Sequence, residues 1–164
     1  MYRYFNLADI HERYPFLRVP IWDSYDYETS TYTRFYRPEE ASYFDSFPTG
    51  WWVGFGEQMC EEIRDCLLRH GGANFLYGVR VIELKEKYGA LIFELDYAGL
   101  SEYDGANDAI DDVEEILTKY FYVSQHTCIE CGAKATRTSL GWIAPYCDKC
   151  GSPNAKYEPI EEES

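Results

Sequence analysis

Four cysteines near the end of the chain are the residues whose spacing points most directly to a chemistry. They form two C-x-x-C-G motifs, which run from Cys128 to Gly132 and from Cys147 to Gly151. Two residues between thiols let one tight turn aim both sulfurs at a single ion, and the glycine that follows can adopt a positive φ that turns backbone N–H groups toward the sulfurs. The fifteen residues between the two pairs lie at the edge of the spacing expected for a zinc site. The sequence therefore predicts one tetrahedral metal ion held by Cys128, Cys131, Cys147 and Cys150.

The predicted ion is structural zinc, because four thiolate ligands leave no position for water or a substrate. The same all-sulfur ligation suits a rubredoxin-like iron site, so iron stays open. Disulfides fit less well because the expected compartment is reducing. A redox pair fits less well because the motif is duplicated and lacks a βαβ context. His126 is interpreted as an exposed histidine, with a substitute ligand or a group beside the ligands as the alternative. Cys60 and Cys66 are interpreted as core or boundary residues.

The hydrophobic periodicity predicts an α+β fold, in which a β-hairpin or small antiparallel sheet is packed by two helices. Apolar residues recur at three- and four-residue steps over 50–70 and 104–124, which indicates two amphipathic helices. Residues 80–84 and 91–97 have the composition and alternation of two strands, and Gly89 supplies a positive φ for the turn between them.

Glycine, proline and acidic residues predict where these elements end. Gly71 and Gly72 are expected to end the first helix, and Asp104 is expected to cap the second. Pro153 and Asn154 discourage a helix after the last cysteine, which favours a zinc ribbon over a treble clef.

Four regions are expected along the chain. Residues 1–49 form an aromatic-rich N-terminal segment that packs on the core, 50–125 form the α+β core, 126–157 form the zinc ribbon, and 158–164 form a flexible acidic tail.

The formal net charge of −14 limits the kinds of partner. The segment from Cys128 to Gly151 has three basic and two acidic residues, so the negative charge lies in the rest of the chain. Such a body repels a phosphate backbone and favours a basic partner. The sequence has no run of 18 apolar residues and no ordinary secretory signal, so we expect no membrane span and a cytoplasmic location.

Two groups of charged or aromatic residues are candidate partner contacts. Carboxylates recur at helical spacing on the second predicted helix and could bind a cation or a basic partner, although a solvated helix face is the simpler interpretation. Lysines and aromatic rings of the hairpin and ribbon could meet a phosphate or an acidic partner, although lysines also protect exposed sheet edges, and the ribbon tryptophan could simply cover the metal site. These candidates are Asp108, Asp111, Asp112 and Glu115 in the first group, and Lys85, Lys87, Tyr88 and Trp142 in the second.

Three features together resemble a family of small, largely uncharacterised phage and bacterial proteins. They are Gly50-Trp51-Trp52, the hairpin ELKEKYGALIF over 83–93, and the C-x-x-C motifs downstream. The family combines a Gly-Trp helix, a VKEKYGxLxF-like hairpin, a further helix and a C-terminal cysteine knuckle. The resemblance spans about residues 50–151 and implies a phage or bacterial setting, but it brings no activity that can be carried over.

The functional expectation is a zinc-binding interaction protein of phage type that binds and inhibits a host defence or nucleic-acid-binding protein, as a counter-defence factor would. The first alternative is a nucleic-acid-binding or regulatory module that acts through the ribbon and the hairpin lysines, which the charge makes less favourable. The second is a small enzyme, although His11, His70 and His126 lie in no recognisable catalytic motif. The aromatic content of 18% is also compatible with a homodimer.

Overall fold

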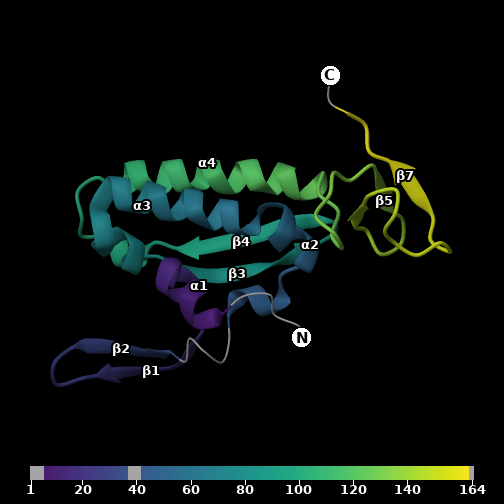
Figure 1. Ribbon diagram of the computed structural model, residues 1–164. Helices are drawn as coiled ribbons and strands as arrows, with labels where there is room; N and C mark the ends of the chain where they lie inside the picture. Colours follow the sequence, from purple (N-terminus) through teal and green to yellow (C-terminus); the bar gives the residue numbers. More distant parts are fainter. Residues whose placement is uncertain (1–5, 37–41, 163–164) are drawn as a thin grey trace.

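The computed structural model describes residues 6–36 and 42–162, and within them it has the predicted α+β class (Figure 1). Three small antiparallel sheets combine with helices, and their strand orders are β1-β2, β3-β4 and β6-β5-β7. The helices and short helical turns are α1 (Leu7–Arg13), η1 (Pro15–Leu17), η2 (Tyr43–Ser46), α2 (Thr49–Trp51), the π-helix η3 (Trp52–Gly56), α3 (Glu57–Gly78), η4 (Ala98–Leu100) and α4 (Ala106–Gln125). The strands are β1 (Pro20–Asp26), β2 (Thr31–Tyr36), β3 (Arg80–Lys87), β4 (Ala90–Asp96), β5 (Arg137–Ser139), β6 (Pro145–Tyr146) and β7 (Tyr157–Pro159).

The body of the protein is an antiparallel helix pair, α3 and α4, that lies along the β3–β4 hairpin (Figure 1). The pairing of α3 with α4 brings the start of one beside the end of the other, as the ion pair between Glu62 and Lys119 at 2.6 Å shows. One continuous core joins these elements to η1 and η2, which contact β3. No helix in the described part of the chain is long and apolar enough to cross a membrane.

The first long helix differs from the predicted 50–70 segment at both ends. It begins as α2 and η3, and α3 continues past Gly71 to Gly78. The predicted end at Gly71 and Gly72 is confirmed for the first helical segment, because Gly72 has φ 63° and ψ −151°, a non-helical conformation, and α3 is two helical segments that meet at a kink there. The sequence did not predict the helical segment after the kink, which ends at Gly78 and buries Phe75 and Leu76 in the core.

The start of α4 also differs from the prediction. Gly105, with a left-handed φ of 82°, precedes the first residue of the helix, and no side chain caps it, so Asp104 is not the N-cap.

The β3–β4 hairpin agrees closely with the sequence pattern. Tyr88 and Gly89 both have positive φ, at 52° and 80°, which is the geometry of a two-residue type I′ turn. Leu91, Phe93 and Leu95 of β4 are buried, as their alternation predicts.

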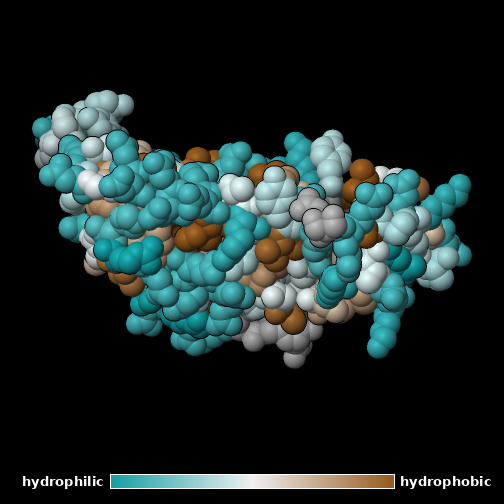
Figure 2. Space-filling view, turned by 90° about the horizontal axis from the view of Figure 1, so that it is seen from above, coloured by the Kyte–Doolittle hydropathy of each residue, from teal (hydrophilic) through white to brown (hydrophobic). Residues whose placement is uncertain are grey.

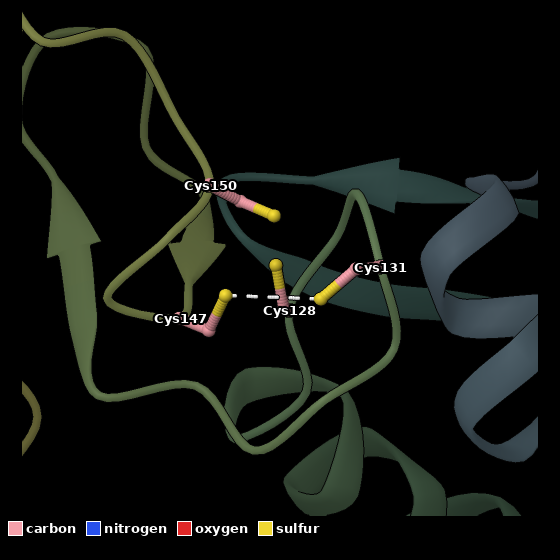
Figure 3. Close-up of side chains that lie close together, drawn as sticks. All are labelled: Cys128, Cys131, Cys147 and Cys150. Carbon is pink, nitrogen blue, oxygen red and sulfur yellow. Dashed lines mark hydrogen bonds between the residues drawn. The ribbon is translucent and has the colours of Figure 1, made fainter.

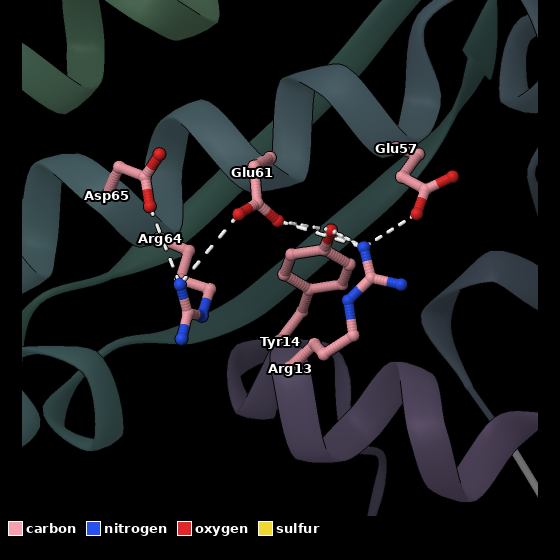
Figure 4. A network of polar contacts seen from close by, with 6 residues as sticks. All are labelled: Arg13, Tyr14, Glu57, Glu61, Arg64 and Asp65. Atoms are coloured by element: carbon pink, nitrogen blue, oxygen red, sulfur yellow. Dashed lines mark hydrogen bonds and ion pairs between the residues drawn. The ribbon is translucent and has the colours of Figure 1, made fainter.

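The N-terminal segment divides into a buried part and a projecting part. Helix α1 is attached to α3 by a polar network, in which Tyr14 donates a hydrogen bond to Glu61 at 2.7 Å and Arg13 meets Glu57 at 2.6 Å (Figure 4). Arg64 and Asp65 continue the network along α3. The β1–β2 hairpin instead projects from the body (Figure 1).

The C-terminal residues form what we call the cysteine module, residues 126–159. No helix follows the last cysteine in the described residues, as predicted, and the next regular element is β7, which pairs with β5. The prediction of a flexible tail is therefore wrong for residues 158–162. Residues 158 and 159 belong to β7, the Ile160 N–H donates to the Thr136 carbonyl oxygen at 3.0 Å, and Glu162 pairs with Lys134 at 2.6 Å. Residues 163–164 lie outside the described residues.

Candidate metal centre

The four predicted cysteines form one cluster in which the side chains point toward each other (Figure 3). Their Sγ atoms all lie within 4.8 Å of one another, and those of Cys131 and Cys147 are 3.7 Å apart. Tetrahedral zinc with Zn–S bonds of about 2.3 Å separates its sulfurs by about 3.8 Å. All four are free thiols. The cluster therefore has the donor set and the spacing to bind a metal ion such as zinc.

Two glycine turns orient the sulfurs in the way that the repeated motif predicts. Gly132 and Gly151 have φ of 82° and 92°, a conformation that strains other residues. In the second turn the backbone N–H of Lys149 is hydrogen-bonded to Cys147, and this contact lowers the pKa of Cys147 to about 7. The Cys150 thiol donates a hydrogen bond to the Cys147 sulfur, and this contact raises the pKa of Cys150. Because metals bind thiolates, a pKa near neutrality favours metal binding at ordinary pH.

The first cysteine turn packs against α2, where the long helix begins. The N–H of Gly50 donates to the Ile129 carbonyl oxygen at 3.0 Å, and the indole Nε1 of Trp51 donates to the Thr127 carbonyl oxygen at 3.0 Å. A Cβ atom at Gly50 would lie only 2.4 Å from the Cys128 carbonyl oxygen. The Gly-Trp motif therefore has a physical role, because it lets two backbones approach and then joins them by hydrogen bonds.

A second glycine one turn later extends the same contact. A Cβ at Gly54 would lie 2.9 Å from the Gly132 carbonyl oxygen. Sequence reasoning noted the Gly-Trp pair but not this contact. The four-residue spacing of Gly50 and Gly54, which places both on one helix face, is the signal that could have indicated it.

His126, the histidine near the cluster in sequence, is not one of its ligands in the described residues. His126 is exposed, and its Nδ1 lies 2.9 Å from the Tyr122 carbonyl oxygen. Within the described residues the cluster suited to a metal at this place contains the four cysteines alone. The exposed-histidine interpretation is the one that the structure favours.

The candidate carboxylates lie on α4 but do not form a single uniform face. Asp108, Asp111 and Glu115 are exposed. Asp112 instead turns toward α3, where its Oδ2 lies 2.6 Å from Nε2 of His70.

The second candidate group comes together at one place. Lys85, Lys87, Tyr88 and Trp142 line a shared cleft of about 310 Å³, which also includes Glu86, Gly141 and Ile143. The rings of Tyr88 and Trp142 are 76% and 77% exposed. We call this feature the hairpin–module cleft. Sequence reasoning named Lys85, Lys87 and Tyr88 on the hairpin and Trp142 in the ribbon. It did not indicate that they meet, and it missed Ile143, because nothing local shows that the hairpin turn and the cysteine module are in contact.

Charges in the hairpin–module cleft are close to balance. Lys85 pairs with Glu83, and Glu86 accepts a hydrogen bond from the N–H of Gly89 at 2.7 Å. Lys87 lies 5.7 Å from the centroid of the Tyr88 ring. The cleft is therefore aromatic and only weakly basic.

No protein-family model, no curated protein and no solved structure matches this chain. The site is therefore interpreted from its own geometry.

Proposed function

We propose that this chain is a zinc-stabilised interaction protein that binds a host protein through the hairpin–module cleft. The observation that carries the proposal is the pairing of two highly exposed rings, Tyr88 and Trp142, across one concave site. Tyrosine and tryptophan that fill pockets account for much of the binding energy of protein interfaces. In this proposal the ion at the four cysteines is structural, and it holds Trp142 opposite the hairpin.

The charge of the helices favours a basic partner. Helix α3 carries four acidic residues and two Lys or Arg, and α4 carries five acidic residues and one lysine. The face seen from above is largely hydrophilic, with small separate hydrophobic patches (Figure 2). Such a surface attracts a basic protein over a distance and repels nucleic acid, while the aromatic cleft supplies the short-range contact. A nucleic-acid-binding host protein has a basic surface that complements this charge. Binding of this chain to that surface would inhibit the host protein, in keeping with the resemblance to phage proteins.

A tagged pull-down from bacterial lysate, divided into nuclease-treated and untreated halves, tests the proposal. We expect a stoichiometric protein partner that survives nuclease. Trp142→Ala should weaken its capture by at least about 2 kcal/mol, or roughly thirtyfold. Tyr88→Asn should also weaken it, since asparagine tolerates the positive φ of this turn.

The matched control is Tyr27→Ala, because this ring is 87% exposed but lies in the turn of the β1–β2 hairpin. This variant should capture the partner as well as the wild type does. Equal capture by Trp142→Ala would remove the cleft from the proposal. A partner lost on nuclease treatment, or nucleic acid alone, would favour the alternative of a nucleic-acid module acting through Lys85 and Lys87.

A further inference from the structure

A second group of metal-ligating side chains lies between α3 and α4, away from the cysteine module. Cys66 and His70 are four residues apart on α3, so both point to the same side of the helix. Asp112 reaches them from α4. One ligand atom from each residue lies within 4.8 Å of the other two.

The three donors differ in exposure in a way that suits a metal ion. Cys66 is buried, with 1% of its surface exposed, whereas the side chains of His70 and Asp112 are 20% and 48% exposed. An ion could therefore enter from the Asp112 side, and a water molecule could take a fourth position there. A thiolate and a carboxylate would together neutralise a divalent ion, which lowers the cost of placing charge between two packed helices.

The distances require only a local adjustment to hold zinc. Nitrogen and oxygen ligands on a tetrahedral zinc ion lie about 3.3 Å apart, and sulfur and nitrogen ligands about 3.5 Å apart. His70 Nε2 and Asp112 Oδ2 are now 2.6 Å apart, so the ion would take the place of the proton that they share. Rotation of the half-exposed Asp112 side chain can lengthen this distance.

Other chemistry for these residues is less consistent with their surroundings. A Cys–His–Asp nucleophilic triad needs a thiol that a substrate can reach, and Cys66 is buried. A simple ion pair between His70 and Asp112, with Cys66 as a core residue only, is the arrangement without a metal, and the metal content measured below distinguishes it from a metal site. Thiolate, imidazole and carboxylate are together a ligand set of zinc sites with three protein ligands.

We propose that Cys66, His70 and Asp112 bind a second divalent transition-metal ion, with zinc as the best fit, which joins α3 to α4. This inference does not depend on the proposed partner or on the cleft. The proposed site also differs from the four-cysteine cluster in two ways. Its ligands are of three types, and one coordination position stays open to solvent.

Metal content of the full-length protein after zinc loading and removal of free ion tests the inference. The wild type should retain two ions per chain. Asp112→Asn, which changes a half-exposed side chain and can still hydrogen-bond to His70, should retain one, and so should His70→Ala. A further change of Cys147→Ser in the Asp112→Asn chain should remove the remaining ion, which assigns that ion to the cysteine module.

Cys60→Ala is the matched control, because Cys60 is also a buried thiol of α3 but lies outside the group. It should retain two ions even if it lowers the melting temperature. Cobalt added to the zinc-free protein should give a thiolate-to-metal absorption in a Cys147→Ser chain that disappears when Cys66→Ala is added. One ion per wild-type chain at saturating zinc, or two ions in both Asp112→Asn and His70→Ala, would overturn the inference.

Discussion

Residue by residue, the cysteine module depends on backbone groups as much as on thiols. Gly132 and Gly151 take the left-handed conformation that turns the chain around each pair of sulfurs. The guanidinium of Arg137 donates to the Cys150 carbonyl oxygen at 2.8 Å and stacks 3.8 Å from the centroid of Tyr157. These contacts hold the second turn in place, so that a metal ion meets ligands that are already arranged.

Loss of one ligand should therefore separate metal binding from the rest of the fold. Cys147→Ser is expected to lower the metal content by one ion per chain and to open the cysteine module to protease, because metal binding and folding of small zinc modules are coupled. A chelator should likewise open the cysteine module of the wild type to protease. The core around α3 should still melt cooperatively.

Cys60→Ser provides the comparison for this measurement. It places a hydroxyl at a fully buried position of α3 and should lower stability without changing the metal content. A Cys147→Ser chain that keeps its full metal content would contradict the four-cysteine assignment.

Among the elements, the start of the long helix and the first cysteine turn make a close backbone contact. Gly50 and Gly54 face this turn, and the Trp51 ring is fully buried beside it. The hairpin supports the same region, since the N–H of Leu91 donates to the hydroxyl of Ser124 at 2.9 Å near the end of α4. The module is thus packed on the α+β core through backbone contacts that only small residues permit.

Gly50→Ala should disturb this contact directly. Its added methyl group would meet backbone atoms of Cys128 and Ile129, at 2.4 and 2.5 Å, which cannot rotate away. We expect a loss of about 1–3 kcal/mol in the free energy of unfolding, measured by urea denaturation. Val53→Ala on the same helical segment, where the side chain is 65% exposed, should change it by less than about 0.5 kcal/mol. Equal effects of the two changes would show that the close approach is unimportant.

For the whole molecule, buried tyrosines give a dependence of stability on alkaline pH. Burial raises the pKa of Tyr14 and Tyr120 above the ordinary value of about 10, and the carboxylate of Glu61 adds to the effect at Tyr14. The unfolded chain would release these protons near pH 10, while the folded chain would keep them. Their contribution to stability is therefore complete below about pH 10 and is lost as the pH rises further.

The urea concentration at the midpoint of unfolding should accordingly decrease as the pH rises from about 9.5 to 11. Tyr120→Phe should make this fall less steep, because it removes one of the groups that titrate differently in the two states. Tyr27→Phe should leave the slope unchanged, since this ring is exposed. A midpoint that stays constant across this range would contradict the burial of the phenols.

The sequence by itself was enough for features that depend on neighbouring residues. Local rules predict features that are encoded within a few positions. These are the two C-x-x-C-G turns, the turn at Gly89, the alternation of β4 and the buried stripe of α4. The same rules placed a break at Gly71 and Gly72, where the helix is kinked, but they did not indicate the second helical segment beyond it, which buries Phe75 and Leu76.

Only the tertiary structure decided which of these parts meet. The hairpin–module cleft joins residues 85–88 to 141–143, and the second metal-ligating group joins Cys66 and His70 to Asp112. Each depends on how α3, α4, the hairpin and the cysteine module pack against one another. Packing is determined by the shapes of surfaces from distant parts of the chain, and no local pattern of residue types contains that information.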